Sequence, residues 1–332
     1  MKPKHILVTG GGGFLGKEIC KQLVERGYQV SSFSRKTYFE LEKMGIKSFQ
    51  GNLCNYESIL PALSKCDSII HTASLAGIWG DKQQYYQTNI IGTRNLLIAA
   101  RESSIKRFIY TSSPSVVFED KDIKGSDESI SYSKKFTCTY PYTKKEAEKE
   151  VLQSSDINSY VSVALRPHLI WGPGDPHFLP RLLSQSKAKK IRRVGNGKNL
   201  VDIIHVKNAA YAHVLALENI LENKNMHGKA YFLGQERPVN LWDFLNQLLS
   251  CYNEKQITKK IPFPFAYTMG YLLEKIYKIF NWVNKEPPMT KFLALQMSKS
   301  HYFSHENAKK DFSYKPIISI EEGLEELKKL CC

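Results

Sequence analysis

Tyr140 and Lys144 are the residues of this sequence whose types and spacing best suit proton transfer. They lie four apart, and Pro141 followed by a run rich in Lys and Glu predicts a helix start, which places both side chains on one face. Free tyrosine titrates near pH ~10, and a nearby ammonium lowers that pKa. The pair therefore predicts acid–base chemistry on a hydroxyl or carbonyl group. An incidental spacing is the alternative, because a Tyr and a Lys four apart occur in many helices.

A glycine-rich turn near the start of the sequence predicts a dinucleotide site. The apolar residues 6–8 read as a strand, residues 9–16 contain five glycines, and a helical pattern follows that ends at Gly27. In such a turn the backbone approaches a pyrophosphate, which sits on the free N–H groups of the helix. A flexible glycine turn is the alternative. The glycine pattern of dinucleotide-binding turns fits this segment in two ways, starting at Gly10 or at Gly11. Both fits contain Gly13 and Gly16, with Phe14 and Leu15 between them.

The end of the second expected strand, residues 29–33, indicates which dinucleotide is bound. A carboxylate that would hold the ribose 2′-hydroxyl is missing, and Ser34, Arg35 and Lys36 stand there. One hydroxyl and two cations suit a 2′-phosphate, so NADP(H) is favoured. Ordinary surface charge is the alternative interpretation of Arg35 and Lys36, and NAD(H) then remains open.

Strands and helices alternate along the first half of the chain. Residues 68–73, 108–111 and 161–165 read as buried strands, with helices expected at 93–100 and 142–153. This order predicts an α/β fold with a Rossmann-type, doubly wound parallel sheet. We expect an NAD(P)-binding domain over residues 1–170, to which residues 200–220 return. Residues 171–332 are expected to form mainly a smaller substrate-binding domain.

Composition sets wide limits. The chain has 332 residues, of which 42% are hydrophobic and 24% charged, as in ordinary globular proteins. The sequence opens almost directly on the first strand without the pattern of a cleavable signal, so a cytoplasmic location is expected. Seven cysteines without metal-ligand spacing predict reduced thiols and no metal site. Cys331 and Cys332 follow two lysines; a simple tail is favoured there, and lipidation is the alternative.

The net charge of +15 suggests nucleic acid or a membrane surface as partners. The charge is dispersed and belongs to no DNA-binding motif, so no nucleic-acid partner is expected. Residues 261–283 carry many aromatic and aliphatic residues interrupted by charges, which excludes a comfortable membrane span. Packing or pocket lining is favoured for this stretch. Peripheral membrane association, a multienzyme complex and a homodimer are left open.

Taken together, these residues resemble the extended short-chain dehydrogenase/reductase superfamily, and within it the 3β-hydroxysteroid dehydrogenase branch. Residues 9–16 match its cofactor turn, and Tyr140 and Lys144 match its catalytic pair. The resemblance implies that Ser113, with Ser112 as the fallback, supplies the catalytic hydroxyl, and that Asn89 is a further catalytic residue, near the cofactor. It also implies that Lys144 holds the cofactor ribose. Further cofactor contacts are implied for Asn52, Leu53, Ala73, Pro167 and His168.

Three longer segments, residues 76–80, 114–118 and 165–177, are similar to bacterial reductases of 2-alkyl-3-oxoalkanoates in olefin synthesis. This similarity implies a small, lipid-like substrate, a long-chain β-keto acid. Arg181 or His168 is the expected carboxylate partner; backbone contact alone is the alternative for His168. Further substrate contacts are expected from Trp79, Ser115 and Trp171, although core packing is an equal alternative for the tryptophans. The other expected chain-lining residues are Leu75, Ile78, Phe265, Tyr267 and Leu272.

Two departures from the family pattern limit the alternatives. Asn52 stands where an aspartate usually meets the adenine, which alters that contact. Pro114 and Ser115 replace the acidic pair of nucleotide-sugar dehydratases, which argues against dehydration. A sterol or steroid 3β-dehydrogenase, a nucleotide-sugar epimerase and a non-catalytic NADP sensor remain alternatives. The sensor is least favoured because Tyr140 and Lys144 are both present, and His205 is expected to be structural.

Overall fold

The computed structural model describes residues 3–330. A seven-stranded parallel sheet forms the centre of the molecule. All six strand pairs of this sheet are parallel, which confirms the expected fold class. The chain reverses direction across the sheet between β1 and β4, where the carboxyl ends of parallel strands leave a crevice for ligands. In sheet order the strands are β12 (Lys229–Leu233), β7 (Val161–Pro167), β5 (Arg107–Thr111), β4 (Ser68–His71), β1 (His5–Thr9), β2 (Gln29–Ser34) and β3 (Lys47–Gln50).

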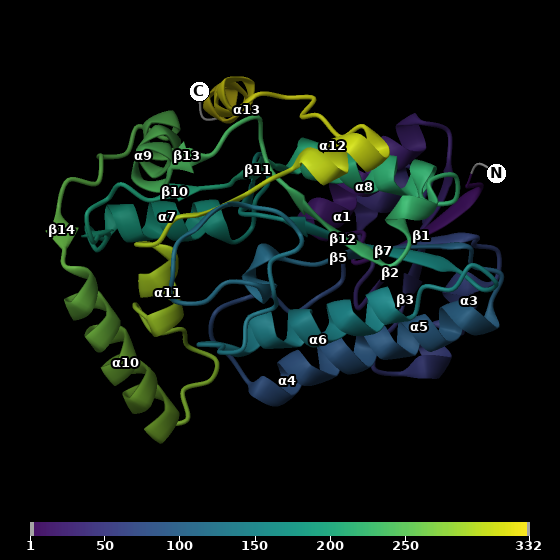
Figure 1. The fold of residues 1–332 in the computed structure, drawn as a ribbon, viewed down its shortest axis with the longest axis horizontal. Helices are drawn as coiled ribbons and strands as arrows, with labels where there is room; N and C mark the ends of the chain where they lie inside the picture. Colours follow the sequence, from purple (N-terminus) through teal and green to yellow (C-terminus); the bar gives the residue numbers. More distant parts are fainter. Residues whose placement is uncertain (1–2, 331–332) are drawn as a thin grey trace.

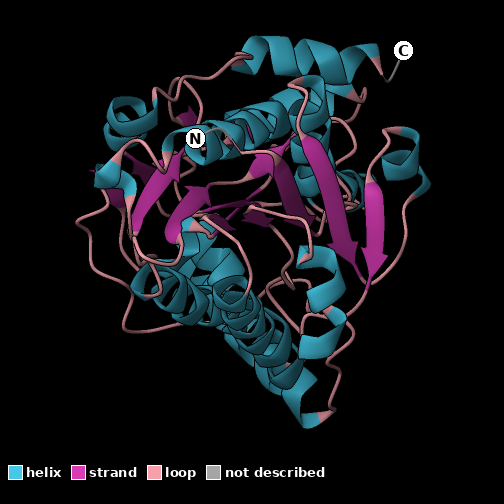
Figure 2. Cartoon of the chain, turned by 90° about the vertical axis from the view of Figure 1, so that its right-hand side faces the viewer, coloured by secondary structure: helices cyan, strands magenta, loops and turns pink. Residues whose placement is uncertain are grey.

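Helices cover both faces of this sheet because its strands are apolar on both sides (Figures 1 and 2). Ile6 and Val8 face one core, and Leu7 between them faces the other, as the two-residue period of a strand requires. The first core is closed by α1 (Phe14–Glu25), α8 (Val206–Asn219) and α12 (Glu306–Phe312). The second is closed by α3 (Leu60–Leu63), α5 (Gly92–Glu102) and α6 (Thr139–Gln153). Shorter helices connect these elements: α2 (Phe39–Lys43), η1 (Tyr56–Ser58), α4 (Lys82–Tyr86) and the π-helical turn η2 (Gln87–Ile91).

The rest of the chain packs beyond the carboxyl ends of the large sheet around a separate core. A small sheet in the order β13 (Val239–Asn240), β10 (Leu200–Val201), β15 (His301–Phe303) and β6 (Ile123–Ser126) joins the two parts. Two short pairs complete the strands: β8 (Ile170–Trp171) with β11 (Ile204–His205), and β9 (Arg193–Val194) with β14 (Lys260–Ile261). The helices here are α7 (Phe178–Lys187), α9 (Leu241–Cys251), α10 (Phe263–Ile279), α11 (Lys291–Gln296) and α13 (Ile320–Lys329), with the short turn η3 (Pro114–Val116). A further turn, η4 (Lys224–Met226), buries Met226 in the first core of the large sheet.

The return of the chain to the large sheet is more extensive than residues 200–220. Helix α8 packs against α1 as the return predicts, but the strand expected just before it is only β11, which pairs with β8. The strand that joins the large sheet is β12, in register with β7. Helix α12 also packs on β12 and α8. The second half of the sequence therefore supplies the edge strand β12 and the helices α8 and α12 to the large sheet and its helix layer.

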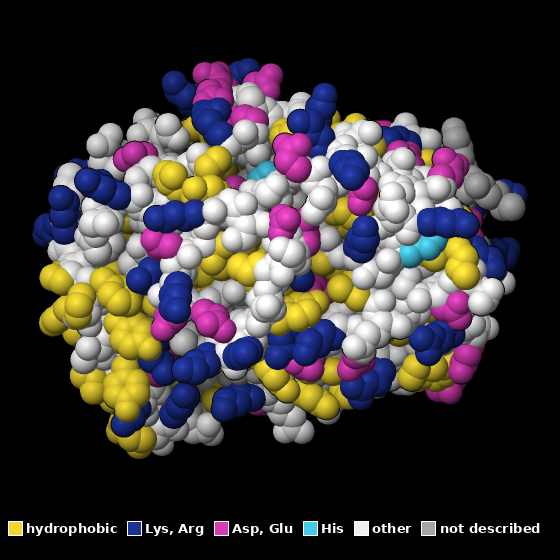
Figure 3. Space-filling view, in the orientation of Figure 1, with side chains coloured by type: hydrophobic (Ala, Val, Ile, Leu, Met, Phe, Trp, Pro, Cys, Tyr) yellow, Lys and Arg dark blue, Asp and Glu magenta, His cyan; other side chains and the backbone are white. Residues whose placement is uncertain are grey.

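Helix α10 projects from the molecule and leaves much of its apolar surface exposed. It contacts α11, and Figure 3 shows hydrophobic side chains gathered with basic side chains over this corner of the molecule. The exposed large side chains of this segment are Phe265, Met269, Tyr271, Leu272, Ile276, Ile279, Phe280 and Trp282. Within residues 3–330, α10 and every other helix are too short or too polar to cross a membrane. Cys331 and Cys332 lie outside the described residues.

Candidate active site

A cavity of about 740 Å³ lies over the glycine turn, at the point where the strand order reverses between β1 and β4. We call it the glycine-turn cavity. Among its lining residues are most of those expected to bind a dinucleotide: Gly10, Gly13, Phe14, Leu15, Gly16, Ser34, Arg35, Asn52, Leu53 and Ala73. Lys36, Lys144, Pro167 and His168 do not line it. Tyr38 and the segment 72–75 line it as well, and sequence reasoning assigned no role to Tyr38.

The glycines of this turn are required by space and backbone conformation. Gly10 has φ +71°, in the left-handed region that favours glycine. A Cβ on Gly16 would lie 2.2 Å from the carbonyl oxygen of Gly10, so any side chain there would force the turn apart. Helix α1 begins at Phe14 after Gly13, whose backbone is extended and which has no side chain to cap the helix. Its first N–H groups therefore face the cavity, and this geometry fits the pyrophosphate of a dinucleotide.

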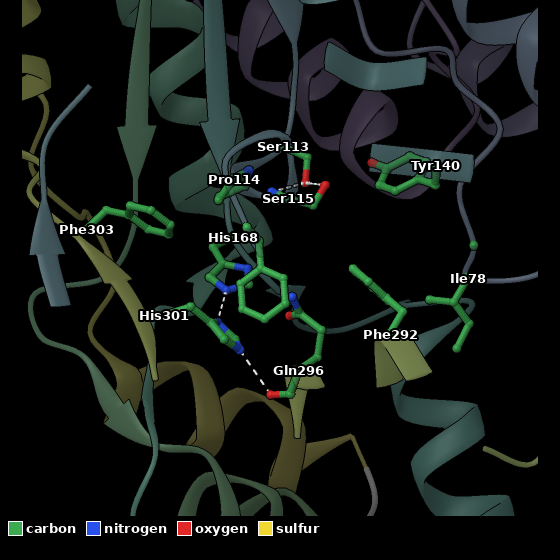
Figure 4. A pocket seen from close by; sticks show the side chains of 12 residues that line it. Ile78, Ser113, Pro114, Ser115, Tyr140, His168, Phe292, Gln296, His301 and Phe303 are labelled. Atoms are coloured by element: carbon green, nitrogen blue, oxygen red, sulfur yellow. Dashed lines mark hydrogen bonds between the residues drawn. The ribbon is translucent and has the colours of Figure 1, made fainter. Parts of the chain in front are cut away.

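A second, smaller cavity of about 180 Å³ lies beside Ser113 and Tyr140 (Figure 4). We call it the Ser–Tyr cavity. Segments far apart in the sequence meet here, because the loops after β4, β5 and β7 all emerge at the same edge of the sheet and face α11 and β15. Its lining residues are Gly77, Ile78, Ser113, Pro114, Ser115, Phe118, Tyr140, His168, Phe292, Gln296, His301 and Phe303.

Ser113, Ser115 and Tyr140 form a hydroxyl cluster on one wall of this cavity. The Oγ atoms of Ser113 and Ser115 lie 2.9 Å apart, and the backbone N–H of Ser115 donates to Ser113 Oγ. Burial raises the pKa of Tyr140 to about 12, while a hydrogen bond with Ser113 opposes the shift. Tyr140 is therefore protonated at neutral pH, the form that donates a proton. Ser112, the fallback for Ser113, is buried and lines neither cavity.

Lys144 is buried next to this cluster. Its Nζ donates to the backbone oxygen of Thr111 at 2.5 Å and lies 4.1 Å from the ring centre of Tyr110. Burial lowers the pKa of Lys144 to about 7, and the carboxylate of Glu148, one turn further along α6, opposes that shift. The effect of Lys144 on the pKa of Tyr140 stays a prediction. Burial dominates both groups, and the opposing contact on Tyr140 is Ser113.

We predict that Lys144→Met stabilises the protein at neutral pH, by about 1–3 kcal/mol in the free energy of unfolding. The folded-state pKa near 7 lies below the ordinary 10.5, so the unfolded chain binds the proton more tightly. The cost of burying the ammonium is complete below pH 7 and disappears as pH rises towards 10.5. Urea unfolding across this range should show the advantage of the variant shrinking with pH. Lys145→Met is the matched control, and an advantage independent of pH would contradict the assignment.

Asn89 holds the cavity walls together. Its Oδ1 accepts from the backbone N–H of Leu75, and its Nδ2 donates to the backbone oxygen of Leu75 and to Thr143 Oγ1. Thr143 in turn donates to the carbonyl oxygen of Tyr140. Asn89 is buried in η2 and lines neither cavity. Its position therefore ties the loop beside the glycine-turn cavity to the first turn of α6, where Tyr140 lies.

Histidines form the wall of the Ser–Tyr cavity opposite the hydroxyl cluster (Figure 4). His168 Nε2 and His301 Nδ1 are 2.6 Å apart, and His301 Nε2 donates to the backbone oxygen of Gln296 at 3.0 Å. Burial lowers the pKa of both histidines, that of His168 well below its ordinary value. The side chain of His168 thus faces the space where a substrate would lie, so it presents more than its backbone.

Three residues expected to touch substrate lie elsewhere. Trp171 is completely buried between His205 and Phe244, which makes it a core residue. Trp79 donates through Nε1 to the backbone oxygen of Trp282 and fastens the end of α10. Arg181 forms a 2.5 Å ion pair with Glu286 and lines neither cavity, so it is not available there for a carboxylate. Arg181 is held by its ion pair with Glu286, and Trp171 is held by packing in the core.

Of the six residues expected to line an alkyl chain, two line a cavity and four do not. Ile78 lines the Ser–Tyr cavity, and Leu75 lines the glycine-turn cavity. Phe265 and Leu272 are exposed on α10, and Tyr267 packs between two cores. Trp79 is the sixth. His205 is buried against Trp171, in agreement with the structural role expected for it.

Sequence reasoning missed the wall formed by α11 and β15, which contributes Phe292, Gln296, His301 and Phe303. Residues 291–303 carry no motif, and they reach the cavity through long-range packing: β15 pairs in parallel with β6 and β10, and α11 packs on α10. One signal was available: His301 and Phe303 alternate with a partly exposed Tyr302, the two-residue period of a half-buried strand. Among residues 3–330, no group of three or more His, Cys, Asp and Glu side chains could hold a metal ion.

Comparison with known proteins agrees with this geometry. Residues 7–265 match the model of the 3-beta hydroxysteroid dehydrogenase/isomerase family. The chain is 45% identical to a 2-alkyl-3-oxoalkanoate reductase of Shewanella oneidensis over 98% of this chain and 86% of that protein. It is 35% identical to a sterol-4-alpha-carboxylate 3-dehydrogenase, decarboxylating, of Mus musculus, over 98% of this chain and 90% of that one.

Solved structures show the same fold at lower identity. A UDP-glucuronic acid 4-epimerase from Bacillus cereus in complex with NAD superposes with a TM-score of 0.73 at 20% identity, covering 99% of this chain and all of the other. That likeness concerns the fold alone. The family match and the names of the relatives together make this protein an oxidoreductase of the dehydrogenase and reductase type. The chain belongs to the 3-beta hydroxysteroid dehydrogenase/isomerase family, within the extended short-chain dehydrogenases/reductases.

Proposed function

We propose that this protein reduces 2-alkyl-3-oxoalkanoates, which are β-keto acids, to the corresponding 3-hydroxy acids with NADPH. The observation that carries the proposal is the 45% identity, over nearly the whole chain, to a protein named for this reaction. The sterol dehydrogenase is more distant, at 35%. The Ser–Tyr cavity, with a protonated tyrosine on one wall, provides what reduction of a ketone needs from the protein.

In the proposed mechanism, the glycine turn with Ser34 and Arg35 would hold a nicotinamide cofactor, which would supply the hydride for the carbonyl carbon. Tyr140 donates its phenolic proton to the carbonyl oxygen, and the tyrosinate regains a proton from solvent. Ser113 donates a hydrogen bond to the same oxygen, and Ser115 fixes the orientation of Ser113. Lys144 stabilises the tyrosinate when its ammonium is charged, and Glu148 favours that charged form.

The size of the Ser–Tyr cavity suits the reacting end of such a substrate. At about 180 Å³ it is smaller than the roughly 300–1,000 Å³ of pockets that enclose a drug-sized ligand. A β-keto acid head group can enter, while alkyl chains would extend past Ile78 and Phe292 at its rim. A fused sterol ring system is much larger. Lysine and arginine are both missing from the lining residues, which gives no support to a nucleotide-sugar diphosphate at this wall.

The substrate is tested by following the absorbance of NADPH with two candidates, each offered with the cofactor form that its reaction requires. A 2-alkyl-3-oxoalkanoate should be reduced, and the 3-hydroxy acid should be recovered by mass spectrometry. The competing substrate is a 4-carboxysterol, offered with oxidised cofactor. Turnover of the sterol without reduction of the keto acid would overturn the proposal.

The preference for NADPH rests on Arg35, which lines the glycine-turn cavity beside Ser34. Because a guanidinium pairs with phosphate through several hydrogen bonds, we predict that Arg35→Ala raises the Kd for NADPH by about 10- to 100-fold, the loss of about 1.5–3 kcal/mol expected of a charge-assisted contact. The Kd for NADH should change little. Fluorescence titration with both cofactors measures this. Lys36→Ala is the matched control, since Lys36 lies outside the cavity lining, and equal losses for NADPH and NADH would contradict the assignment.

A further inference from the structure

The His168–His301 pair is the only part of the Ser–Tyr cavity lining that can carry positive charge, because the other ten lining residues are neutral or, as Tyr140, can only become anionic. A β-keto acid is an anion at neutral pH. Burying a carboxylate without a partner costs several kcal/mol, roughly, so a site for this substrate needs a counter-charge. Arg181, the other residue considered for this role, is occupied by Glu286 outside the cavity.

The hydrogen bonds of the pair fix where its protons lie. The backbone oxygen of Gln296 can only accept, so Nε2 of His301 carries a hydrogen. In the neutral ring Nδ1 of His301 is then bare and accepts from Nε2–H of His168. This leaves Nδ1 of His168 as a bare acceptor. Among residues 3–330 no donor is bonded to that nitrogen, although the ring lines the cavity. A bare ring nitrogen repels a carboxylate, and a protonated one binds it.

We propose that the His168–His301 pair takes up one proton when the carboxylate of the substrate enters the Ser–Tyr cavity, and that the protonated pair binds this carboxylate. This inference rests on the proposed function. The proton comes from solvent and is added at Nδ1 of His168, which then donates to a carboxylate oxygen. His301 continues to accept from Nε2 of His168 and spreads the charge towards the backbone oxygen of Gln296. Bonds to carbon are unchanged in this step.

The groups around the His168–His301 pair keep it neutral in the free protein and allow it to be protonated when a carboxylate binds. Asp202 and Asp122 lie near His301 and raise its pKa, while burial lowers it. His305 opposes charge on His168, yet its Nε2 is held 3.1 Å from Asp202 Oδ2. Burial is the largest cause for both histidines and leaves the ligand-free pair neutral near pH 7. A carboxylate in contact reverses this balance, since an opposite charge within about 4–6 Å favours the charged form.

Proton uptake on binding tests the inference. The probe is a 2-alkyl-3-hydroxyalkanoate, the product, titrated into the full chain with saturating NADPH so that turnover is prevented. Calorimetry in two buffers of different ionisation enthalpy should show uptake of close to one proton per bound acid above neutrality. The Kd of the acid should rise about tenfold per pH unit there, because affinity depends on a proton that becomes scarcer. The methyl ester should bind without uptake and without this pH dependence.

Variants separate the pair from general packing. His301→Gln should abolish uptake and raise the Kd of the acid by about tenfold or more near pH 7, with the Kd of the ester changed less than about twofold. His168→Gln should do the same, and thermal melts report whether each variant folds. His227→Gln is the matched control, because the His227 ring bonds to the backbone oxygen of Ile220 and lines neither cavity.

Several results would overturn the inference: acid binding without proton uptake, equal pH dependence for acid and ester, or failure of the acid to bind. The proposed function fails differently, through absence of keto acid reduction in the turnover assay. A protein that binds the hydroxy acid with uptake of a proton but reduces only another ketone would retain this anion site and lose the proposed substrate.

Discussion

Tyr140→Phe is expected to lower kcat/KM for ketone reduction by about 10²- to 10⁴-fold, the range typical of a lost general acid. The substitution removes only the phenolic oxygen of a side chain that lines the Ser–Tyr cavity and is protonated at neutral pH. Ser113 keeps its bond to Ser115, so the carbonyl can still be held but receives no proton. Steady-state kinetics with NADPH measures the loss, and the Kd of NADPH should stay within about twofold because Tyr140 does not line the glycine-turn cavity.

The control for this variant is Tyr142→Phe on the same helix. Tyr142 is 42% exposed and lines neither cavity, so its loss should leave kcat/KM nearly unchanged. Equal activity of the Tyr140 variant and the native protein would remove Tyr140 from the mechanism. A parallel loss in both tyrosine variants would instead indicate a general effect on α6.

Arg166→Met is expected to lower the free energy of unfolding by about 3–5 kcal/mol, because it leaves a buried carboxylate without its partner. Arg166 on β7 donates to both carboxylate oxygens of Glu148 on α6, and both side chains are almost fully buried. Tyr132 also donates to Glu148. Unlike a surface pair, this one cannot be replaced by water when it is broken. Urea unfolding followed by circular dichroism measures the change.

Helix α6 provides its own control for that experiment. Arg94 forms an ion pair with Glu150, two residues from Glu148. The side chains of Arg94 and Glu150 are both partly exposed. Arg94→Met should cost only about 0–1 kcal/mol, as solvent screens such pairs. Similar losses for the two arginine variants would contradict the distinction drawn from burial.

Local signals in the sequence were enough to predict the fold class and about half of the residues that line the glycine-turn cavity. The turn from Gly10 to Gly16, the strand before it and the helix after it are adjacent in the chain, so pattern and spacing describe their geometry directly. Arg35 and Asn52 follow because parallel strands end at one edge of the sheet. Tyr140 and Ser113 come together for the same reason.

Long-range packing decided what the sequence did not show. His301 reaches His168 across more than a hundred residues of intervening chain, through the small four-stranded sheet whose strands are only two to four residues long. Strands so short leave almost no periodicity to detect. Trp171 and Trp79 look alike in sequence, yet one fills a core and the other fastens a helix end. The late strand β12 was missed because it lies outside the regular alternation of the first half.

The two cavities share no lining residue, and this separation has an evolutionary consequence. Under the proposed function, residues within 10–88 would recognise the reducing agent, whereas four residues of the wall that would meet the carbonyl compound lie within residues 292–303. Mutation can therefore alter what is reduced while leaving intact what does the reducing. A lineage in which only α11 and β15 changed in sequence would keep the cofactor cavity and Tyr140 while it acquired new substrates. A laboratory library confined to the thirteen positions 291–303 would do the same.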